Sequence, residues 1–331
     1  MRCGISSPHV VDGLPDRPAA PIPIAISECL LGSRVRYDGG SSRPAFPHSV
    51  LDRVLAYRGV CPEVGIGMGT PRAPIRLIDG GRVVAVDDAS RDYTSALRDF
   101  GARLAADLGG VAGYVFMQNS PSCGLFQVKV YSGTGGSFKR GGRGAHAHAV
   151  VDRLPDLPVE ENARLNDPLL RENFLTRAFA FAHWQACFGN EPGAGAPRLV
   201  LFHARYKYLL MTHSAPHCER AQALVDAADG AGLQNAEAYR SLLMAGLSRV
   251  PDRAGHTHTL SLIAADIGGW LPKQEHRALT DLVSGYGRGE QPLAAPRAWL
   301  VRNLQRHPQA LALCQTYLDP HPGFPRAGCP A

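Results

Sequence analysis

Three cysteines, Cys29, Cys61 and Cys123, stand in turns where their thiolates could surround one metal centre. The turns are Ser27-Glu-Cys-Leu-Leu-Gly32, Cys61-Pro-Glu63 and Ser120-Pro-Ser-Cys-Gly124. Such Pro-, Gly- and Ser-rich turns leave backbone N–H groups free, and negatively charged sulfurs need these donors. Thiolates are preferred ligands of both iron–sulfur clusters and zinc. The sequence has no C-x-x-C pair, so spacing alone leaves open a cluster, a zinc site or three unrelated buried cysteines.

The other five cysteines carry weaker signals. Cys187 and Cys314 lie on predicted helices among apolar residues and are expected in the core, and Cys218, near a helix start, is a weak ligand candidate. Cys3 and Cys329 lie near the ends of the chain and are expected to have no role. Eight cysteines in 331 residues are too few for a disulfide scaffold, so each is a core residue, a ligand or a nucleophile.

Each of the three cysteine turns follows a predicted buried strand. These strands are residues 22–27, 59–62 and 113–117. Strands alternate with predicted helices in this part of the chain, which indicates a Rossmann-like α/β domain with a largely parallel sheet. Ligands of such sheets bind beyond the carboxyl ends of the strands, so the three cysteines can meet at one rim.

Further elements are predicted from hydrophobic periodicity and turn residues. Helices are expected at 49–57, 92–108 and 167–188, a hairpin at 75–78 and 82–86, a strand at 126–131 and a mobile glycine-rich loop at 133–144.

The pattern changes after a Gly- and Pro-rich stretch at 189–197, which is expected to be a linker. Beyond it, five helices are predicted at 198–211, 219–229, 236–247, 258–270 and 273–286. The expected organisation is therefore a disordered N-terminus (1–21), an α/β catalytic domain (22–188), an all-helical domain (198–320) and a tail (321–331).

Composition limits the class of protein. No apolar run is long enough to span a membrane and the first residues do not resemble a secretory signal, so a cytoplasmic enzyme is expected. The net charge of +6 and the pI of about 9.0 favour anionic partners such as phosphates or RNA, although many metabolic enzymes are equally basic.

Longer motifs around the cysteines resemble those of the TudS-type thiouracil desulfidases over about residues 22–186. The motifs are Cys29-Leu-Leu-Gly-x-x-Val-Arg-Tyr-Asp-Gly-Gly40, Cys61-Pro-Glu-Val-Gly-Ile-Gly-Met-Gly-Thr-Pro-Arg72, Pro74-Ile-Arg-Leu77, Ser120-Pro-Ser-Cys-Gly124, Val128-Lys-Val-Tyr131, Pro158-Val-Glu-Glu161, Arg164-Leu-Asn-Asp167 and Arg171-Glu-Asn173. The helical part resembles the companion domain of RudS-type proteins, which act on 4-thiouridine in tRNA.

The resemblance implies a [4Fe-4S] cluster on Cys29, Cys61 and Cys123, with one iron lacking a protein ligand. It also implies Glu63 as the base that activates water and Ser120 as a second catalytic residue. Ser122 is equally close in sequence to the cluster ligand and is an alternative to Ser120 or a substrate contact.

Charged residues near these motifs are candidates for substrate binding. Arg36, Asp38 and Arg72 follow the first two cysteine turns and could contact the pyrimidine or a phosphate. The alternatives are that Asp38 pairs with an arginine and that Arg72 caps a turn or pairs with an acid. In the helical domain, Arg205 and Lys207 are possible RNA contacts, while solvated charges on an interdomain face are the plainer alternative. Here the chain departs from the family, because the second histidine of a His-x-x-x-Leu-x-His motif is missing.

The expected activity is therefore non-redox desulfidation of 4-thiouridine in tRNA, with release of sulfide. The same chemistry on free thiouracil or 4-thio-UMP is the first alternative. A cluster-binding redox or iron sensor without turnover and a structural zinc module are alternatives of other classes.

Overall fold

The computed structural model describes residues 14–43, 47–132, 136–189, 195–227, 232–306, 316–322 and 324. These residues form two compact units, one running from Ala19 to Phe174 and one containing the described residues before Ala19 and after Phe174. The boundary between the units lies within one long helix, α5 (Pro168–Phe188), which is a different place from the linker expected at 189–197.

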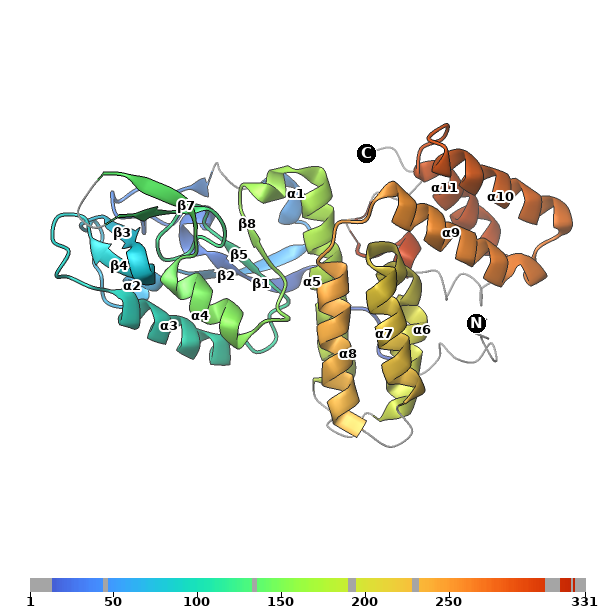
Figure 1. The fold of residues 1–331 in the computed structure, drawn as a ribbon, viewed down its shortest axis with the longest axis horizontal. Coiled ribbons are helices and arrows are strands. Elements are labelled where there is room, and N and C mark those ends of the chain that lie inside the picture. The colour runs from blue at the N-terminus through green and yellow to red at the C-terminus, as the bar shows by residue number, and fades with distance from the viewer. Residues whose placement is uncertain are drawn as a thin grey trace. The chain divides into compact units, whose positions relative to one another are not determined.

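The first unit contains all the strands of the described chain (Figure 1). They are β1 (Ile22–Ser27), β2 (Leu55–Val60), β3 (Ile75–Ile78), β4 (Arg82–Ala85), β5 (Tyr114–Phe116), β6 (Val128–Tyr131), β7 (Phe138–Gly142) and β8 (Val159–Glu161). Its helices are α1 (His48–Leu51), α2 (Pro62–Gly65), α3 (Thr94–Asp107), α4 (Ala145–Arg153) and the start of α5.

Strands β2, β1, β5 and β8 form an entirely parallel sheet in that order. The β1 strand pairs with β2 along its whole length, from Ile22 opposite Leu55 to Ser27 opposite Val60. Its buried residues run almost without interruption, which is typical of a strand covered on both faces. This confirms the predicted α/β class with a parallel sheet.

The second sheet has the order β4-β3-β6-β7 and is mixed. The predicted hairpin is confirmed, since β3 pairs antiparallel with β4 across a turn in which Gly80 and Gly81 have φ angles of 78° and 72°. Part of the segment predicted as a mobile loop is instead the strand β7, which pairs antiparallel with β6. The strand is exposed and lies at the edge of the sheet, so its sequence lacks the buried alternation that would identify it.

Helices α3 and α4 lie side by side (Figure 1). The buried residues of α3 recur at helical spacing, which is why its periodicity predicted it correctly. Close approach of the two helices requires Gly101, because a Cβ there would lie 2.8 Å from the carbonyl oxygen of His146. The helix α4 itself was not predicted.

The helix predicted at 49–57 is wrong beyond its first turn. Only His48–Leu51 is helical, and the chain enters strand β2 at Leu55. Val54 and Leu55 are both buried, and a short apolar run of this kind fits either a helix or a strand when periodicity is the only evidence. This difference from the prediction matters for the site, because Cys61 directly follows β2.

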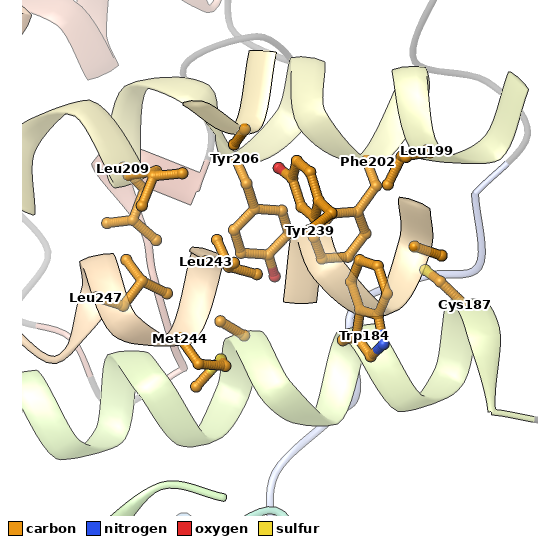
Figure 2. Close-up of a cluster of buried hydrophobic side chains, with 14 of the residues drawn as sticks. Trp184, Cys187, Leu199, Phe202, Tyr206, Leu209, Tyr239, Leu243, Met244 and Leu247 are labelled. Carbon is orange, nitrogen blue, oxygen red and sulfur yellow. The ribbon is translucent and has the colours of Figure 1, made fainter. Parts of the chain in front are cut away.

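The second unit is all-helical, as predicted. It contains the rest of α5 and α6 (Ala196–His213), α7 (Ala215–Asp226), α8 (Gly232–Leu247), α9 (Arg253–Ile267), α10 (Lys273–Gly287) and α11 (Ala294–Leu304), of which α11 was not predicted. One buried cluster contains residues of α5, α6, α7 and α8, which we call the α5–α8 cluster, and Figure 2 shows its aromatic rings facing one another. Trp184 stacks on Phe188 with 4.0 Å between ring centroids.

A second cluster joins α9, α10 and α11 with Tyr208 of α6 and with Tyr317 and Leu318. The segment before Ala19 also belongs to this unit, because Leu14 packs against the first cluster and the carbonyl of Pro15 lies 3.0 Å from His183 Nε2. Residues 14–18 are thus packed where the sequence analysis expected disorder through residue 21. Residues 1–13 and most of the predicted tail lie outside the described residues.

Candidate functional site

The three candidate ligand cysteines follow three neighbouring strands of the parallel sheet. Cys29 comes after β1, Cys61 directly follows β2, and Cys123 lies in the loop after β5. Because β2, β1 and β5 are adjacent and parallel, their carboxyl ends share one edge of the sheet. The structure thereby brings together residues that lie 32 and 62 positions apart.

The thiols are close enough to influence one another's ionisation. Burial raises the pKa of Cys29 to about 11, with Arg36 opposing and Cys61 adding to the rise. Burial also raises the pKa of Cys123, and the negative charges of Glu63, Cys29 and Cys61 raise it further. The pKa of Cys61 is raised in the same way by burial. All three thiols are therefore protonated near neutral pH, and binding a metal would displace their protons.

Donor groups surround the sulfurs, as an iron–sulfur cluster requires. Cys61 precedes the N-terminus of α2, and the backbone amides of Val64 and Glu63 direct hydrogen bonds at it that partly offset the rise of its pKa through burial. Hydrogen bonding from Ser27 has the same effect on the pKa of Cys123, which burial raises. The donor chemistry of this edge therefore fits a thiolate-bound inorganic group.

Within the described residues, no three His, Cys, Asp or Glu side chains stand close enough to hold a single metal ion. The thiolates of a [4Fe-4S] cluster bind different iron atoms, so their sulfurs are spaced more widely than the ligands of one ion. The fit to a cluster rests on the donor set and on the shared sheet edge.

The carboxylate of Glu63 lies between the side chains of Ser122 and Arg72. Ser122 Oγ donates to Glu63 Oε1 at 2.8 Å, and Arg72 donates to Glu63 Oε2 through Nε at 2.8 Å and through Nη2 at 2.5 Å. The side chains of Glu63 and Arg72 are only 14% and 6% exposed. The carboxylate is consequently fixed in orientation on both of its oxygens.

Arg72 also bonds to the backbone of the first two cysteine segments. Its Nη2 donates to the carbonyl of Val35 at 2.8 Å, and its Nη1 donates to the carbonyl of Gly69 at 3.1 Å. Arg72 was a candidate for binding substrate or for pairing with an acid, and in the structure its guanidinium is engaged by protein groups, including the carboxylate of Glu63. This geometry suits a residue that positions Glu63.

The two serines of the third cysteine turn have different partners. Ser120 Oγ accepts hydrogen bonds from the backbone amides of Ser122 at 3.2 Å and Cys123 at 3.0 Å. Ser122 is fully buried and reaches Glu63 instead. Ser120 thus shapes the turn that presents Cys123, and its own hydroxyl hydrogen stays available for a further acceptor.

Residues later in the chain contact the turn that carries Ser122 and Cys123 and the residues just after it. Gly144 leaves no room for a side chain, since a Cβ there would lie 2.5 Å from the carbonyl carbon of Ser122. Glu161, at the end of β8, accepts hydrogen bonds from the amides of Leu125 at 2.8 Å and Phe126 at 3.0 Å. Glu161 was not singled out as a site residue, although it belongs to the Pro158–Glu161 motif.

The segment after Cys29 carries Arg36 and Asp38. Arg36 lowers the pKa of Cys29 against the larger effect of burial, and its Nη1 donates to Ser42 Oγ at 2.9 Å. Asp38 Oδ1 accepts from the amide of Gly40 at 3.0 Å, and this bond lowers the pKa of the Asp38 carboxyl. Arg36 therefore lies near the cysteines, while Asp38 is exposed and stabilises its own turn.

The candidate RNA contacts in the helical unit are engaged within the protein. Lys207 Nζ lies 3.4 Å from Asp266 Oδ2, and its side chain is 14% exposed. Arg205 is half-buried. The neighbouring His203 is buried, and its Nδ1 lies 3.0 Å from Tyr239 Oη. The side of the helix that carries His203 therefore faces the core, while Arg205 and Lys207 are partly exposed.

The remaining cysteines and histidines agree with a structural role where they are described. Cys187 and Cys218 are buried in the α5–α8 cluster. His256 Nδ1 lies 3.2 Å from Tyr317 Oη, while His258 is exposed. Three further cysteines lie outside the described residues: Cys3, Cys314 and Cys329. Among described helices, none combines the length and the apolar character needed to cross a membrane.

Comparison with known proteins adds two family matches. Residues 24–162 match the model of the 2-thiouracil desulfurase family, and residues 207–322 match a family described as a protein of unknown function, DUF1722. The predicted pairing of a desulfidase domain with this type of companion is therefore confirmed.

Individual relatives are similar to parts of the chain. The chain is 30% identical to the uncharacterized protein YbbK of Bacillus subtilis over 155 residues, which are 44% of this chain and 99% of YbbK. It is 29% identical to the uncharacterized protein YbgA of Escherichia coli over 134 residues, 39% of this chain and 78% of YbgA. A solved structure titled [4Fe-4S]-dependent thiouracil desulfidase TudS is 31% identical, with a TM-score of 0.35, and covers 46% of this chain and 97% of that one.

Proposed function

Since the chain belongs to the 2-thiouracil desulfurase family through residues 24–162, we propose that it desulfurises a thiolated pyrimidine, 4-thiouridine in tRNA. In this reaction water adds to the carbon of the C=S group, the carbon keeps the oxygen, and sulfur leaves as sulfide. No electron is gained or lost. The observation that carries the proposal is the carboxylate of Glu63, which Ser122 and Arg72 fix at the edge of the parallel sheet that the three cysteine turns share.

The proposal assigns the cofactor to the three thiols. Cys29, Cys61 and Cys123 would hold a [4Fe-4S] cluster, whose fourth iron then has no protein ligand. When bound, the cluster supplies a Lewis acid with affinity for soft thiocarbonyl sulfur. A cytoplasmic setting, which keeps thiols reduced, suits this site.

Glu63 is the group placed to take the proton of the attacking water. A general base must lie within hydrogen-bond reach of the proton it removes, and Glu63 is two residues from the ligand Cys61. Ser122 and Arg72 hold the carboxylate so that no reorientation is needed during the reaction.

Ser120 is the group placed to donate a hydrogen bond to the pyrimidine. Its oxygen is already used by two backbone amides, which fixes the direction of its hydroxyl. Ser122 acts through Glu63 in this scheme. Arg36, near Cys29, and Asp38 remain candidate substrate contacts on the rim.

The helical unit supports the choice of tRNA over a small substrate. Its companion family accompanies the desulfurase domain in one chain, and a whole extra unit is not needed to bind a free base. Arg205 and Lys207 are the basic residues proposed to face RNA there. Lys207 would exchange Asp266 for a phosphate.

The test is anaerobic reconstitution of the full chain, followed by parallel assays on thiolated tRNA, 4-thio-UMP and free thiouracil. We expect iron and acid-labile sulfide in the protein and release of sulfide from thiolated tRNA. Turnover of only the small substrates would favour the alternative substrate, and a bound cluster without any turnover would favour a sensor. Zinc in place of iron and sulfide would exclude the proposed chemistry.

Point variants of the full chain separate the substrates better than deletion of the helical unit, because deletion would expose the half of α5 that belongs to its core. Lys207→Met should slow action on thiolated tRNA and spare 4-thio-UMP. Lys273→Met, at the start of α10 in the same unit, is the matched control and should change neither.

A further inference from the structure

A cavity of about 230 Å³ opens beside the turn that carries Ser120 and Cys123. Two of its walls are strands β3 and β6, and the third is the turn itself, through Asn119 and Pro121. Arg76, Val128, Lys129 and Tyr131 line the cavity from the two strands. Val128 also packs against Gly124, directly after Cys123. The cavity therefore borders the proposed catalytic site.

The charge of this cavity has one sign. Arg76 and Lys129 line it, and no acidic residue does so among the described lining residues. Neither cation takes part in an ion pair within the described part of the chain, unlike Arg72 and Arg82 nearby. Two uncompensated cations in one concave site raise the local concentration of anions.

Both cations are held in place by aromatic rings instead of by acids. The guanidinium carbon of Arg76 lies 5.7 Å from the centroid of the Tyr131 ring, and Lys129 Nζ lies 4.4 Å from the centroid of the Phe138 ring. Cation–π contacts fix a side chain without neutralising it. The positive charges are thus pre-organised and remain available.

Arg76 has a donor that the protein leaves unused. Its Nε is buried and has no hydrogen-bond partner among the residues that the structure describes. Leaving a buried donor without a partner is unfavourable, so native sites usually satisfy it with a ligand or water. On the far side of the cavity, Arg140 donates to Asn119 Oδ1 at 3.4 Å, which leaves the amide NH₂ of Asn119 as a further donor at the wall.

We propose that this cavity is a phosphate subsite, in which Arg76 and Lys129 bind a phosphate group of the substrate nucleotide. The proposal deepens the proposed function and rests on it: a substrate whose base reaches Ser120 would place its phosphate in the neighbouring cavity. The subsite selects phosphorylated substrates over the free base and the nucleoside. The phosphate is either the monoester of a free nucleotide or a diester in RNA.

The test measures equilibrium binding to the full chain without reconstitution, so that it does not depend on turnover. Uridine, UMP and the dinucleoside monophosphate UpU are titrated by calorimetry. We expect UMP or UpU to bind at least about tenfold more tightly than uridine, since charge-assisted bonds to the phosphate are absent for uridine. Tighter UpU assigns the subsite to RNA, and tighter UMP assigns it to free nucleotides.

Point variants test whether Arg76 and Lys129 are the residues that bind the phosphate. Arg76→Gln and Lys129→Gln should each weaken the phosphorylated ligand about tenfold or more and leave uridine unchanged, whereas Arg76→Lys should retain part of the affinity. Arg82→Gln is the control, because Arg82 lies on the neighbouring strand β4 outside the cavity and pairs with Asp92. Lys129→Gln provides an independent test if loss of Arg76 disturbs folding.

Equal affinities for uridine and both phosphorylated ligands, or phosphate-dependent binding that ignores both variants, would overturn the subsite. Failure of the proposed function has a different signature. If the chain does not desulfurise any substrate but binds UMP or UpU through Arg76, the phosphate subsite stands and the proposed activity is wrong. If the chain is active but binds uridine as tightly as UMP and UpU, the activity stands and the subsite is wrong.

Discussion

Ser122 Oγ donates a 2.8 Å hydrogen bond to Glu63 Oε1, although the two residues are 59 positions apart. On the other carboxylate oxygen, Arg72 continues the connection to the carbonyl of Val35. Val35 follows the first cysteine, Glu63 the second, and Ser122 precedes the third. One carboxylate therefore links all three segments that carry the cysteines.

Glu63→Gln should keep the fold and the cluster but slow sulfide release by about 100-fold to 10,000-fold, the usual contribution of a general base. The amide has nearly the same shape and cannot take the proton from water. The measurement is single-turnover sulfide release with iron content determined on the same sample. Glu28→Gln, which removes a carboxylate next to Cys29, serves as the control, and full sulfide release by Glu63→Gln would exclude Glu63 as the general base.

Ser122→Ala and Ser120→Ala should fail in different ways. Loss of the Ser122 hydroxyl frees one oxygen of Glu63, so we expect a shifted pH–rate profile with normal cluster content. Loss of the Ser120 hydroxyl leaves the amides of Ser122 and Cys123 without their acceptor, so we expect lower cluster retention as well as lower activity. Iron content and pH–rate profiles of both variants check this, and identical defects would contradict the assignment.

Arg72→Met should destabilise the chain by about 3 kcal/mol, because it leaves the largely buried carboxylate of Glu63 without its partner. Adding Glu63→Gln should recover part of this loss, since the amide carries no charge. Urea denaturation of the two single variants and the double variant measures the coupling. Arg82→Met breaks an exposed pair and should cost no more than about 1 kcal/mol.

The helical unit should lose stability in mild acid. Burial lowers the pKa of His203 from 6.5 to about 4. Between these two values the unfolded chain binds a proton that the folded chain does not, so the free energy of unfolding falls as the pH drops below about 6.5. The slope reaches about 1.4 kcal/mol per pH unit for each such histidine.

Urea denaturation at a series of pH values, followed by helical circular dichroism, tests this dependence. His203→Gln should reduce the slope, although it also lowers the overall stability. His258→Gln removes an exposed histidine and should leave the slope unchanged. An unaltered slope in His203→Gln would exclude this histidine as a source of the acid sensitivity.

Much of the arrangement could be predicted from the sequence, because the cysteines follow strands. A buried apolar strand such as Ile22–Ser27 is evident from its residue types, and parallel strands place their following turns at one edge. This sufficed to predict that Cys29, Cys61 and Cys123 share an edge. The α/β class and five of the six helices after α5 followed from periodicity in the same way.

Other features depend on contacts that no local pattern records. Residues Leu55–Val60 form a strand because they pair with β1, and β7 forms an edge strand because it pairs with β6. The different partners of Ser120 and Ser122 depend on a turn whose geometry is set by Asn119 at a φ of 57°. His203 follows helical spacing, but only the packing of α8 shows that its face is buried.

Ser122 and Arg72 both donate hydrogen bonds to Glu63, and Arg72 also donates to the carbonyl of Val35. All of these bonds are between amino-acid atoms. These hydrogen bonds do not depend on iron, so we expect the three cysteine segments to stay linked when air destroys the proposed cluster. Repair would then call for fresh iron and sulfide and not for a newly synthesised chain. Because the protein part of the site survives the loss of the proposed cluster, we expect the same protein molecule to take up a new cluster more than once.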